Sequence, residues 1–385
     1  MQRTIAIAAG GTAGHVVPAL AVADALRERG ARVFFIGGDR AERDLVPAAG
    51  YEFHEIAVEG LSRTNPLRAA RGLGRSAAAT VRARRLLRDG AADAVMGGGG
   101  YVAAPVALAA ATLGLPIVLT EADSHLGLAN RALAPLARRV CLSFGLDGRD
   151  GDRYVVTGRP GPPPCTDRES ARAGLGIPDG VPCVLVFGGS LGARSINEAA
   201  VDAFGQAPFH VLHVTGSRDY PALVTHPRGS HYDMREYLPV AAFSEALAAS
   251  DLVVARAGGS VFEIAGHGRP AILVPYPHAA AGHQRTNAAW MEAAGAAVVI
   301  DDADLTGGLL RACVDRLLGD PVLLAGMAAA SAGLARPGAA DMVAGVLLDQ
   351  VGDGEQQSHQ VGDGEQQSHS HHSHHSHHSH HPGGG

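Results

Sequence analysis

Three short stretches of the chain place glycine, hydroxyl and acidic residues where a phosphate group can bind. They are residues 10–15 (Gly-Gly-Thr-Ala-Gly-His), 187–193 (Phe-Gly-Gly-Ser-Leu-Gly-Ala) and 256–263 (Arg-Ala-Gly-Gly-Ser-Val-Phe-Glu), and each follows an apolar run. Glycines let the backbone approach a phosphate, and the amides at a helix N-terminus favour negative charge. A glycine turn is also typical of a tight connection, so each stretch taken singly leaves both interpretations open.

The third stretch carries the strongest signal. Its Gly-Gly-Ser can offer amides and a hydroxyl to a diphosphate, and Glu263, one turn later, can accept hydrogen bonds from two ribose hydroxyls. Further along, Gln284 and Asn287 share one helical face. The alternative for Glu263 is a carboxylate that only stabilises a helix N-terminus. The succession of these elements favours the binding interpretation, in which Ser190 of the second stretch also holds the diphosphate.

One titratable side chain stands directly after the first glycine turn. His15 lies at the mouth of a predicted helix, where the helix dipole is expected to hold its pKa low. A neutral imidazole there can act as a general base. The alternative is a histidine that only packs against the helix or caps it.

Rigid elements must position these turns, and the sequence predicts alternating strands and helices. Apolar runs predict strands at residues 4–9, 33–37, 94–96, 117–120, 140–143, 154–157, 183–187, 210–215, 252–255, 271–274 and 297–300. Strands that alternate with helices give parallel sheets. Two strand–turn–helix units, at 4–14 and 183–192, resemble each other and suggest two similar halves. We expect an α/β protein with two Rossmann-like, doubly wound parallel-sheet domains that face a cleft.

Changes in composition predict the domain boundaries. A Pro- and Gly-rich linker at 158–180 separates a domain at 1–157 from a second domain at 181–348. From 349 to 385 the chain repeats Val-Gly-Asp-Gly-Glu-Gln-Gln-Ser-His and then His-His-Ser, and it holds ten of the 20 histidines. Such a tail buries no core and is expected to be disordered. It either binds Ni, Zn or Cu ions loosely or is an appended tag.

Composition also excludes several classes of function. All 32 basic residues are arginine, so a Walker-type phosphate loop and a Schiff-base cofactor, which both need lysine, are excluded. A net charge of −6 argues against general nucleic-acid binding. The 4 cysteines have no paired spacing, so neither a zinc site nor a disulfide framework is supported. Without a secretory leader or a run of about 20 apolar residues, the chain is expected to be soluble and cytoplasmic.

Taken together, the motifs resemble those of glycosyltransferase family 28, and within it the peptidoglycan N-acetylglucosaminyltransferases, which have the GT-B fold. The resemblance covers roughly residues 4–345. The matching segments are 10–18, 97–105 (Gly-Gly-Gly-Gly-Tyr-Val-Ala-Ala-Pro), Glu121 with 127–131, 188–193, 256–263 and 275–287.

The resemblance implies an inverting transfer of N-acetylglucosamine from UDP-N-acetylglucosamine to the C4 hydroxyl of the muramoyl sugar of lipid I, which gives lipid II. It implies no metal and no other cofactor. His15 corresponds to the candidate base, and Glu121 is taken as a second catalytic residue. The expected donor-binding residues are Thr12, Ala13, Gly14, Asp123, Arg159, Ser190, Val240, Gly258, Gly259, Ser260, Glu263 and Gln284. The expected acceptor-side residues are Gly98, Gly99 and Tyr101. An Asp-Ala-Asp triplet at 302–304 is interpreted as a chance acidic run at a strand end, away from these loops.

Because the implied acceptor is linked to a lipid, an arginine-rich region is a candidate membrane-binding surface. Seven arginines crowd one predicted helix: Arg68, Arg71, Arg75, Arg82, Arg84, Arg85 and Arg88. Either they form a solvated helix face, or they dock onto an anionic membrane surface, where each basic side chain adds about 1 kcal/mol. The second interpretation places the protein peripherally on the cytoplasmic face of the cell membrane.

Three departures from the family pattern bear on the acceptor. The family's His-Glu-Gln-Asn reads Thr-Glu-Ala-Asp at 120–123, its Asn-Pro-Val-Arg reads Arg-Pro-Gly-Pro at 159–162, and the turn before Glu263 is one residue shorter. These changes leave open a related GT-B transferase that acts on another lipid or on a natural-product scaffold.

Two other classes share the architecture. A UDP-sugar 2-epimerase is expected to carry several cleft carboxylates for proton removal, and Glu121, Asp123 and Glu263 are the obvious candidates here. A non-catalytic nucleotide-binding module would be suggested by loss of His15, which is present.

Overall fold

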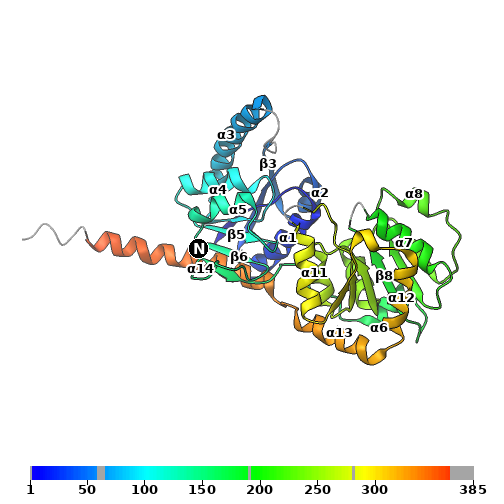
Figure 1. Cartoon of the computed structure of the whole chain (residues 1–385). Helices are drawn as coiled ribbons and strands as arrows, with labels where there is room; N and C mark the ends of the chain where they lie inside the picture. The colour runs from blue at the N-terminus through cyan, green and yellow to red at the C-terminus, as the bar shows by residue number, and fades with distance from the viewer. Residues whose placement is uncertain (1, 59–65, 190–191, 280–281, 365–385) are drawn as a thin grey trace, which may run out of the picture.

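The computed structural model describes residues 2–58, 66–189, 192–279 and 282–364. They form two lobes that lie side by side, each built on one parallel β-sheet covered by helices (Figure 1). The expected α/β class with two doubly wound parallel sheets is confirmed.

The first lobe contains a seven-stranded sheet in the order β3-β2-β1-β4-β5-β6-β7, and each neighbouring pair is parallel. Its strands are β1 (Thr4–Ala8), β2 (Arg32–Gly37), β3 (Glu52–Glu55), β4 (Ala94–Gly97), β5 (Ile117–Glu121), β6 (Arg139–Leu142) and β7 (Tyr154–Val156). Its helices are α1 (Ala13–Glu28), α2 (Ala41–Ala48), α3 (Pro66–Asp89), α4 (Ala103–Thr112), α5 (Leu128–Leu133) and the 3-10 turn η1 (Ala134–Leu136). All five residues of β1 are buried, because helices cover both faces of the sheet.

The second lobe repeats this plan with six parallel strands in the order β10-β9-β8-β11-β12-β13. They are β8 (Cys183–Phe187), β9 (His210–Val214), β10 (Tyr232–Arg235), β11 (Leu252–Ala255), β12 (Ala271–Leu273) and β13 (Ala297–Val299). The helices are α6 (Arg168–Gly174), α7 (Arg194–Phe204), α8 (Tyr220–Leu223), α9 (Val240–Ala249), α10 (Ser260–Gly266), α11 (His283–Ala293), α12 (Gly307–Leu318) and α13 (Pro321–Gly333), with the 3-10 turn η3 (Asp302–Asp304).

The strand order reverses once in each sheet, and the glycine-rich turns lie at these two places. In the first lobe, strands are added outward from β1 toward β3 and then, on the other side, from β4 toward β7. In the second lobe they are added from β8 toward β10 and then from β11 toward β13. Such a switch point leaves a crevice at the carboxyl ends of the strands, where ligands of doubly wound sheets bind. Residues 9–12 and 98–102 follow β1 and β4, and we call them the first-lobe glycine turns. Residues 188–189 with 192–193 follow β8 and residues 256–259 follow β11, and we call them the second-lobe glycine turns.

Side chains pack between the lobes, and the two segments that connect the lobes, near Gly158 and Arg336, touch each other. Phe144 follows β6 of the first lobe, yet its ring centroid is 4.6 Å from that of Phe262 in α10 and 5.2 Å from that of Trp290 in α11. At Gly158, a Cβ atom would lie 2.5 Å from the Cβ of Arg336 on the returning segment. The lobes are therefore joined by packed side chains as well as by the chain itself.

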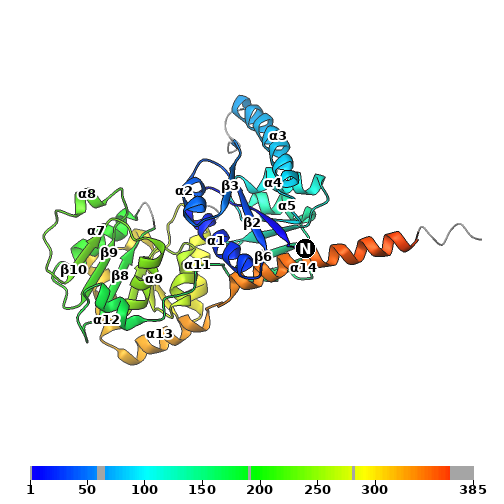
Figure 2. The same cartoon turned by 180° about the vertical axis from the view of Figure 1, so that it is seen from behind.

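The last helix, α14 (Ala339–Gly364), returns to the first lobe and packs against α1 (Figures 1 and 2). Val343, Ala344 and Leu347 are fully buried in the same cluster as the apolar side chains of α1. This arrangement differs from the expected boundaries, which placed residues up to 348 in the second domain and a disordered tail from 349. Burial against α1 fixes the first turns of this helix, which continues to Gly364. The rest of the expected tail, 365–385, lies outside the described residues.

The contact between the first-lobe glycine turns gives a testable prediction. Gly100 has φ +79°, and a Cβ atom there would lie 1.9 Å from the carbonyl oxygen of Gly10. Gly30 has φ +80°, and a Cβ there would meet nothing within 4 Å. Both alanine variants bear the left-handed backbone cost of about 1–2 kcal/mol, but only Gly100→Ala also forces two turns apart. We expect Gly100→Ala to lower the thermal midpoint by at least twice as much as Gly30→Ala in calorimetry. Equal shifts in the thermal midpoint would show that the contact between the two turns does not contribute to stability.

Candidate functional site

A buried carboxylate, Glu42, holds the first-lobe glycine turns. Its Oε2 accepts a hydrogen bond from the Gly11 amide, and its Oε1 accepts one from the Gly38 amide, each at 2.9 Å. The Tyr101 hydroxyl donates to Oε1 at 3.1 Å. Glu42 is 0% exposed and thus ties together the turns after β1, β2 and β4. Sequence reasoning missed this residue, although an acid four residues after a strand-ending Gly-Gly pair is a signal that could have indicated it.

Tyr101, expected on the acceptor side, points back into this assembly. The Arg40 guanidinium lies 4.7 Å from the centroid of its ring. Burial and the neighbouring Glu42 raise the pKa of Tyr101 to about 12, so the phenol stays protonated and donates. In the structure, Tyr101 therefore fixes the turn after β4 through its hydrogen bond to Glu42.

His15 stands at the junction of the two first-lobe glycine turns. A Cβ atom at Gly99 would lie 2.7 Å from its Cδ2, so the imidazole packs directly on that glycine. Its Nδ1 is buried without a hydrogen-bond partner. Burial, and then the charge of Arg159, lower the pKa of His15, while Asp123, Glu121 and Glu42 act in the opposite direction. The imidazole is neutral at pH 7, and burial is a larger cause of this than any single neighbouring charge.

Glu121 is buried and fully engaged in its own loop. Its Oε1 accepts from the Asp123 amide at 3.1 Å, and its Oε2 accepts from the Gly127 amide and from Asn130 Nδ2, both at 2.9 Å. Asn130 also donates to the Thr120 carbonyl at 3.0 Å. These hydrogen bonds order the loop that carries Asp123, so the contacts of Glu121 support a positioning role. The catalytic role expected for Glu121 stays a prediction.

Arg159 joins the two lobes at their switch points. Its Nη2 donates to the carbonyl oxygen of Gly14, on α1, at 2.6 Å. On the other side, a Cβ atom at Gly259 would lie 2.6–2.8 Å from the guanidinium atoms. Burial lowers the pKa of Arg159, whereas the charges of Glu263, Asp123 and Glu121 raise it. Burial raises the pKa of the Glu263 carboxyl, and Arg159 lowers it. Residues predicted from both lobes are thereby brought together around one guanidinium.

The remaining site candidates are distributed over both lobes. Thr12, Ala13 and Gly14 are exposed at the start of α1. In the second lobe, Ser260 begins α10, and Gln284 Nε2 lies 4.0 Å from the Cβ position of Gly258. Gly98 packs against Ala9, and Val240 begins α9 with 39% exposure. Ser190 lies outside the described residues.

A buried polar network underlies the turn after β8. Asn197 Nδ2 donates to the carbonyl of Thr215 and to Asp219, both at 2.9 Å, and its Oδ1 pairs with His213 Nε2 at 3.0 Å. A Cβ atom at Gly192 would lie 1.9 Å from that Thr215 carbonyl oxygen. Burial lowers the pKa of His213 to about 3, so the network carries a neutral imidazole. Sequence reasoning missed these residues because only the fold brings them beneath the turn.

The acidic triplet at 302–304 requires a correction. Asp302 does not lie away from the loops, because its Oδ1 accepts hydrogen bonds from Arg256 at 2.5 Å and from Ser195 at 2.6 Å. The expectation failed because the end of β13 lies only two strands from β11 in the sheet.

Comparison with known sequences identifies the family. Residues 5–142 match the Glycosyltransferase family 28 N-terminal domain, and residues 183–343 match the Glycosyltransferase family 28 C-terminal domain. The chain belongs to glycosyltransferase family 28. The resemblance inferred from the motifs is thereby confirmed.

Relatives of this family 28 glycosyltransferase match along nearly its whole length. A protein of Moorella thermoacetica is 40% identical over 369 residues, which cover 91% of this chain and 100% of that protein. A protein of Halorhodospira halophila is 41% identical over 348 residues, 89% of this chain and 97% of that protein. Both are named UDP-N-acetylglucosamine--N-acetylmuramyl-(pentapeptide) pyrophosphoryl-undecaprenol N-acetylglucosamine transferase.

Solved structures agree in fold. MurG of Acinetobacter baumannii superposes with a TM-score of 0.73 at 29% identity, covering 91% of this chain and 100% of that one. The UDP-GlcNAc 2-epimerase of Neisseria meningitidis, bound to UDP-GlcNAc, gives a TM-score of 0.63 at 12% identity, covering 90% and 100%. At that identity the second likeness shows the fold alone.

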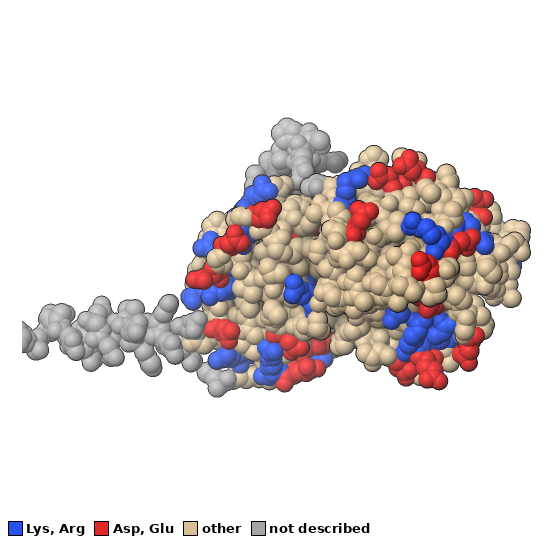
Figure 3. Space-filling view, turned by 60° about the horizontal axis from the view of Figure 1, so that its bottom comes forward, with Lys and Arg blue, Asp and Glu red and all other residues tan. Residues whose placement is uncertain are grey.

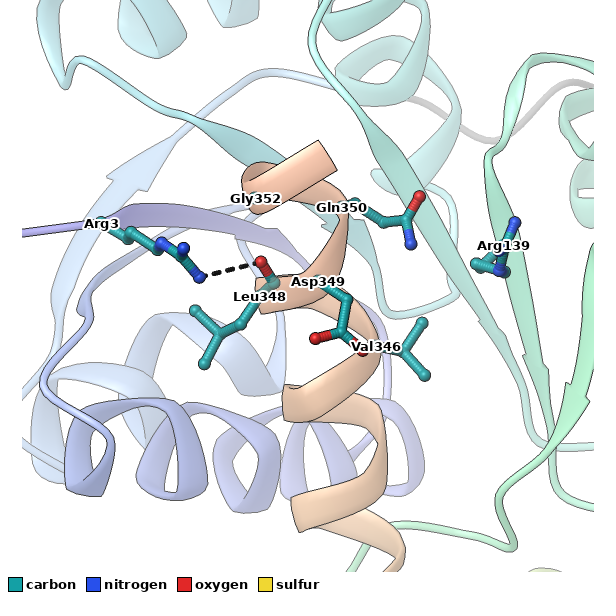
Figure 4. A pocket seen from close by; sticks show the side chains of 7 residues that line it. All are labelled: Arg3, Arg139, Val346, Leu348, Asp349, Gln350 and Gly352. Atoms are coloured by element: carbon teal, nitrogen blue, oxygen red, sulfur yellow. Dashed lines mark hydrogen bonds between the residues drawn. The ribbon is translucent and has the colours of Figure 1, made fainter. Parts of the chain in front are cut away.

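A separate depression of about 470 Å³ lies on the first lobe of the family 28 chain, where α14 crosses the amino ends of β1 and β6 (Figure 4). It is lined by Arg3, Arg139, Val346, Leu348, Asp349, Gln350 and Gly352. Arg3 Nη1 donates to the Leu348 carbonyl at 3.0 Å and helps to hold the helix there. Because the glycine turns lie at the carboxyl ends of the strands, this depression is at the opposite edge of the sheet from the candidate site.

Among the described residues, no group of three or more His, Cys, Asp or Glu side chains is arranged to hold a metal ion.

The role of Glu42 gives a second prediction. In Glu42→Gln, an amide nitrogen faces one of the buried amide donors, which leaves that donor without an acceptor. A buried unsatisfied donor costs about 1–3 kcal/mol. We expect a lowered thermal midpoint and a reduced turnover number. Glu28→Gln, at an exposed position near the end of α1, is the control and should match wild type in both measurements. A Glu42→Gln enzyme with wild-type stability and turnover would contradict this role.

Proposed function

We propose that the chain transfers N-acetylglucosamine from UDP-N-acetylglucosamine to the C4 hydroxyl of the muramoyl sugar in an undecaprenyl-pyrophosphoryl acceptor, the step from lipid I to lipid II. The observation that carries the proposal is the name of relatives that are about 40% identical across about 90% of the chain. The geometry supports it, because the Arg159 guanidinium lies between Gly14, just after the β1 turn of the first lobe, and Gly259, just after β11 of the second.

The donor is expected to occupy the second-lobe side of this crevice. Amides of the turn at 256–259 and the start of α10 offer donors to a diphosphate, and the Arg159 guanidinium adds positive charge beside Gly259. Glu263 is placed one turn into α10, where a carboxylate can accept from ribose hydroxyls. Fixed donors of this kind stabilise the charge that develops on a departing UDP.

His15 is the proposed base on the first-lobe side. The acceptor O4 forms a bond to the anomeric carbon while the bond from that carbon to the UDP oxygen breaks, and UDP leaves with the electron pair. The proton of the acceptor hydroxyl passes to the neutral imidazole. Glu121 and Glu42 fix the loops around His15 and are proposed as positioning residues.

A panel of UDP-sugars with a short-chain lipid I analogue tests the proposal. We expect UDP release with UDP-N-acetylglucosamine only when the acceptor is present, and at least a hundred-fold lower turnover for His15→Ala, within the range of general-base contributions. Release of UDP without any acceptor would point to an epimerase, and turnover only on lipid-free acceptors would point to a natural-product transferase. Undiminished turnover in His15→Ala would remove that residue from the base role.

The pH dependence of the same reaction follows from the lowered pKa of His15. The free enzyme needs neutral His15, so kcat/KM should fall as the pH drops through a value below the ordinary 6.5. Because Arg159 is one of the causes of the lowering, Arg159→Gln should move this acid limb upward, toward 6.5. An acid limb that stays in place in the variant would show that His15 is not the group titrated.

We further propose that the protein docks peripherally on the cytoplasmic face of an anionic membrane through the α3–α4–α5 side of the first lobe. Val81 of α3 is 56% exposed, Leu108 of α4 is 42% exposed and Leu128 of α5 is 65% exposed. Exposed arginines, Arg82, Arg85, Arg88 and Arg131, accompany them. Helix α3 projects from the lobe in both views (Figures 1 and 2). Arg68, Arg71 and Arg75 lie on α3, but their side chains are outside the described residues. No helix among the described residues is long and apolar enough to span a bilayer.

By contrast, the face drawn in Figure 3 shows basic and acidic side chains interspersed over both lobes. The membrane proposal therefore rests on the α3 side, and a liposome pull-down tests it. The triple variant Arg82→Gln, Arg85→Gln, Arg88→Gln should bind phosphatidylglycerol vesicles roughly a hundred-fold more weakly, at about 1 kcal/mol for each charge. A control triple on the second lobe, Arg228→Gln, Arg311→Gln, Arg316→Gln, changes the net charge equally and should bind as wild type does. Equal binding by the two triples would overturn the proposal.

A further inference from the structure

One guanidinium links the loops that follow four strands of the second sheet. Arg256 directly follows β11, and its Nη1 donates to the carbonyl of Val274, after β12, at 3.1 Å. The same nitrogen donates to Asp302, after β13, at 2.5 Å. Its Nη2 donates to Ser195 Oγ, at the start of α7 after β8, at 2.9 Å. The ends of β8, β11, β12 and β13 are thereby tied to a single side chain.

Asp302 closes this arrangement. Its Oδ1 accepts from both Arg256 and the Ser195 hydroxyl, at 2.5 and 2.6 Å, so the three side chains form a closed triangle of hydrogen bonds. The side chains of Arg256 and Asp302 are only 11% and 24% exposed. Removal of the Asp302 side chain would leave the largely buried guanidinium and the Ser195 hydroxyl without the oxygen that accepts their hydrogen bonds, which destabilises that local arrangement.

The arrangement extends to the predicted donor site. The Arg256 guanidinium lies 5.4 Å from the centroid of the Tyr276 ring. The Tyr276 amide donates to Gln284 Oε1 at 2.9 Å, which leaves the amide nitrogen of Gln284 turned toward Gly258. The position of Gln284 beside the glycine turn thus depends on the segment after β12, which Arg256 holds.

We propose that Asp302 is a positioning residue for the nucleotide-sugar donor, acting through Arg256 and Ser195 to fix the second-lobe loops against one another. This inference rests on the proposed function, in which these loops bind a UDP-sugar. Asp302 itself is expected to make no contact with the donor. Its loss should therefore weaken donor binding without changing the use of the acceptor, because the acceptor side is built from the first lobe.

The experiment compares Asp302→Ala and Asp302→Asn with wild type in the full chain. UDP binding is measured by calorimetry, and KM is measured separately for UDP-N-acetylglucosamine and for the lipid I analogue. Asp302→Ala should raise the Kd of UDP and the donor KM roughly ten- to hundred-fold, as expected for lost hydrogen bonds to a charged group, with the acceptor KM unchanged. Asp302→Asn keeps an oxygen that accepts from Arg256 and Ser195, so it should recover most of the affinity. Ser195→Ala should show a smaller effect in the same direction, and it supplies the test if Asp302→Ala does not fold.

Asp304→Ala, on the same 3-10 turn and exposed, is the matched control and should behave as wild type. The inference is overturned if Asp302→Ala binds UDP as wild type does, if it binds UDP more tightly, or if donor and acceptor KM rise together. Asp302→Asn behaving like Asp302→Ala would also overturn it, because charge compensation rather than loop geometry would then be the function. If wild type itself binds no UDP, the proposed function fails and the inference falls with it, whereas wild-type binding with an unaffected Asp302→Ala removes the inference alone.

Discussion

The reversal of strand order at β1/β4 and at β8/β11 is the constraint on which the rest of the structure depends. In each sheet it leaves two neighbouring strand ends whose loops run in opposite directions, and a crevice opens between them. Glycines are required there because the loops must pass one another closely: at Gly100 and Gly192 a Cβ atom would lie 1.9 Å from a backbone oxygen. The fold therefore requires glycines at these turns, whether or not the turns also bind phosphate.

Loops that are packed this closely expose backbone amides that no sheet partner can satisfy, and buried carboxylates meet this need. Glu42 and Glu121 each accept from two backbone amides in the first lobe. In the second lobe the equivalent work is done by side chains acting on carbonyl groups, through Asn197 and Arg256. The two lobes therefore fix their closely packed loops with opposite kinds of hydrogen-bonding group, carboxylate acceptors in the first lobe and amide or guanidinium donors in the second.

Sequence patterns predicted every central strand and the edge strands β7 and β13, but they missed one edge strand in each sheet. All the central strands were expected from their apolar runs, but β3 (Glu52–Glu55) and β10 (Tyr232–Arg235) were not. Each is an outermost strand of its sheet, and each carries two charged residues within four positions, as exposed edge strands often do. Glu42 and Asp302 were missed for a different reason. Their partners are 31 and 46 residues away in the sequence, for Gly11 and Arg256 respectively, so only the packed fold brings them together.

The same reasoning applies to the departure from the family pattern at 159–162. The sequence reads Arg-Pro-Gly-Pro where an arginine is expected at the fourth position, which left the cation in question. In the structure the guanidinium of Arg159, the first residue of the four, lies between Gly14 of one lobe and Gly259 of the other. Pro160 is buried and fixes the backbone just after it, so the side chain is directed from a rigid start. The structure therefore places a positive charge at the junction of the lobes although the fourth residue of the motif is not arginine.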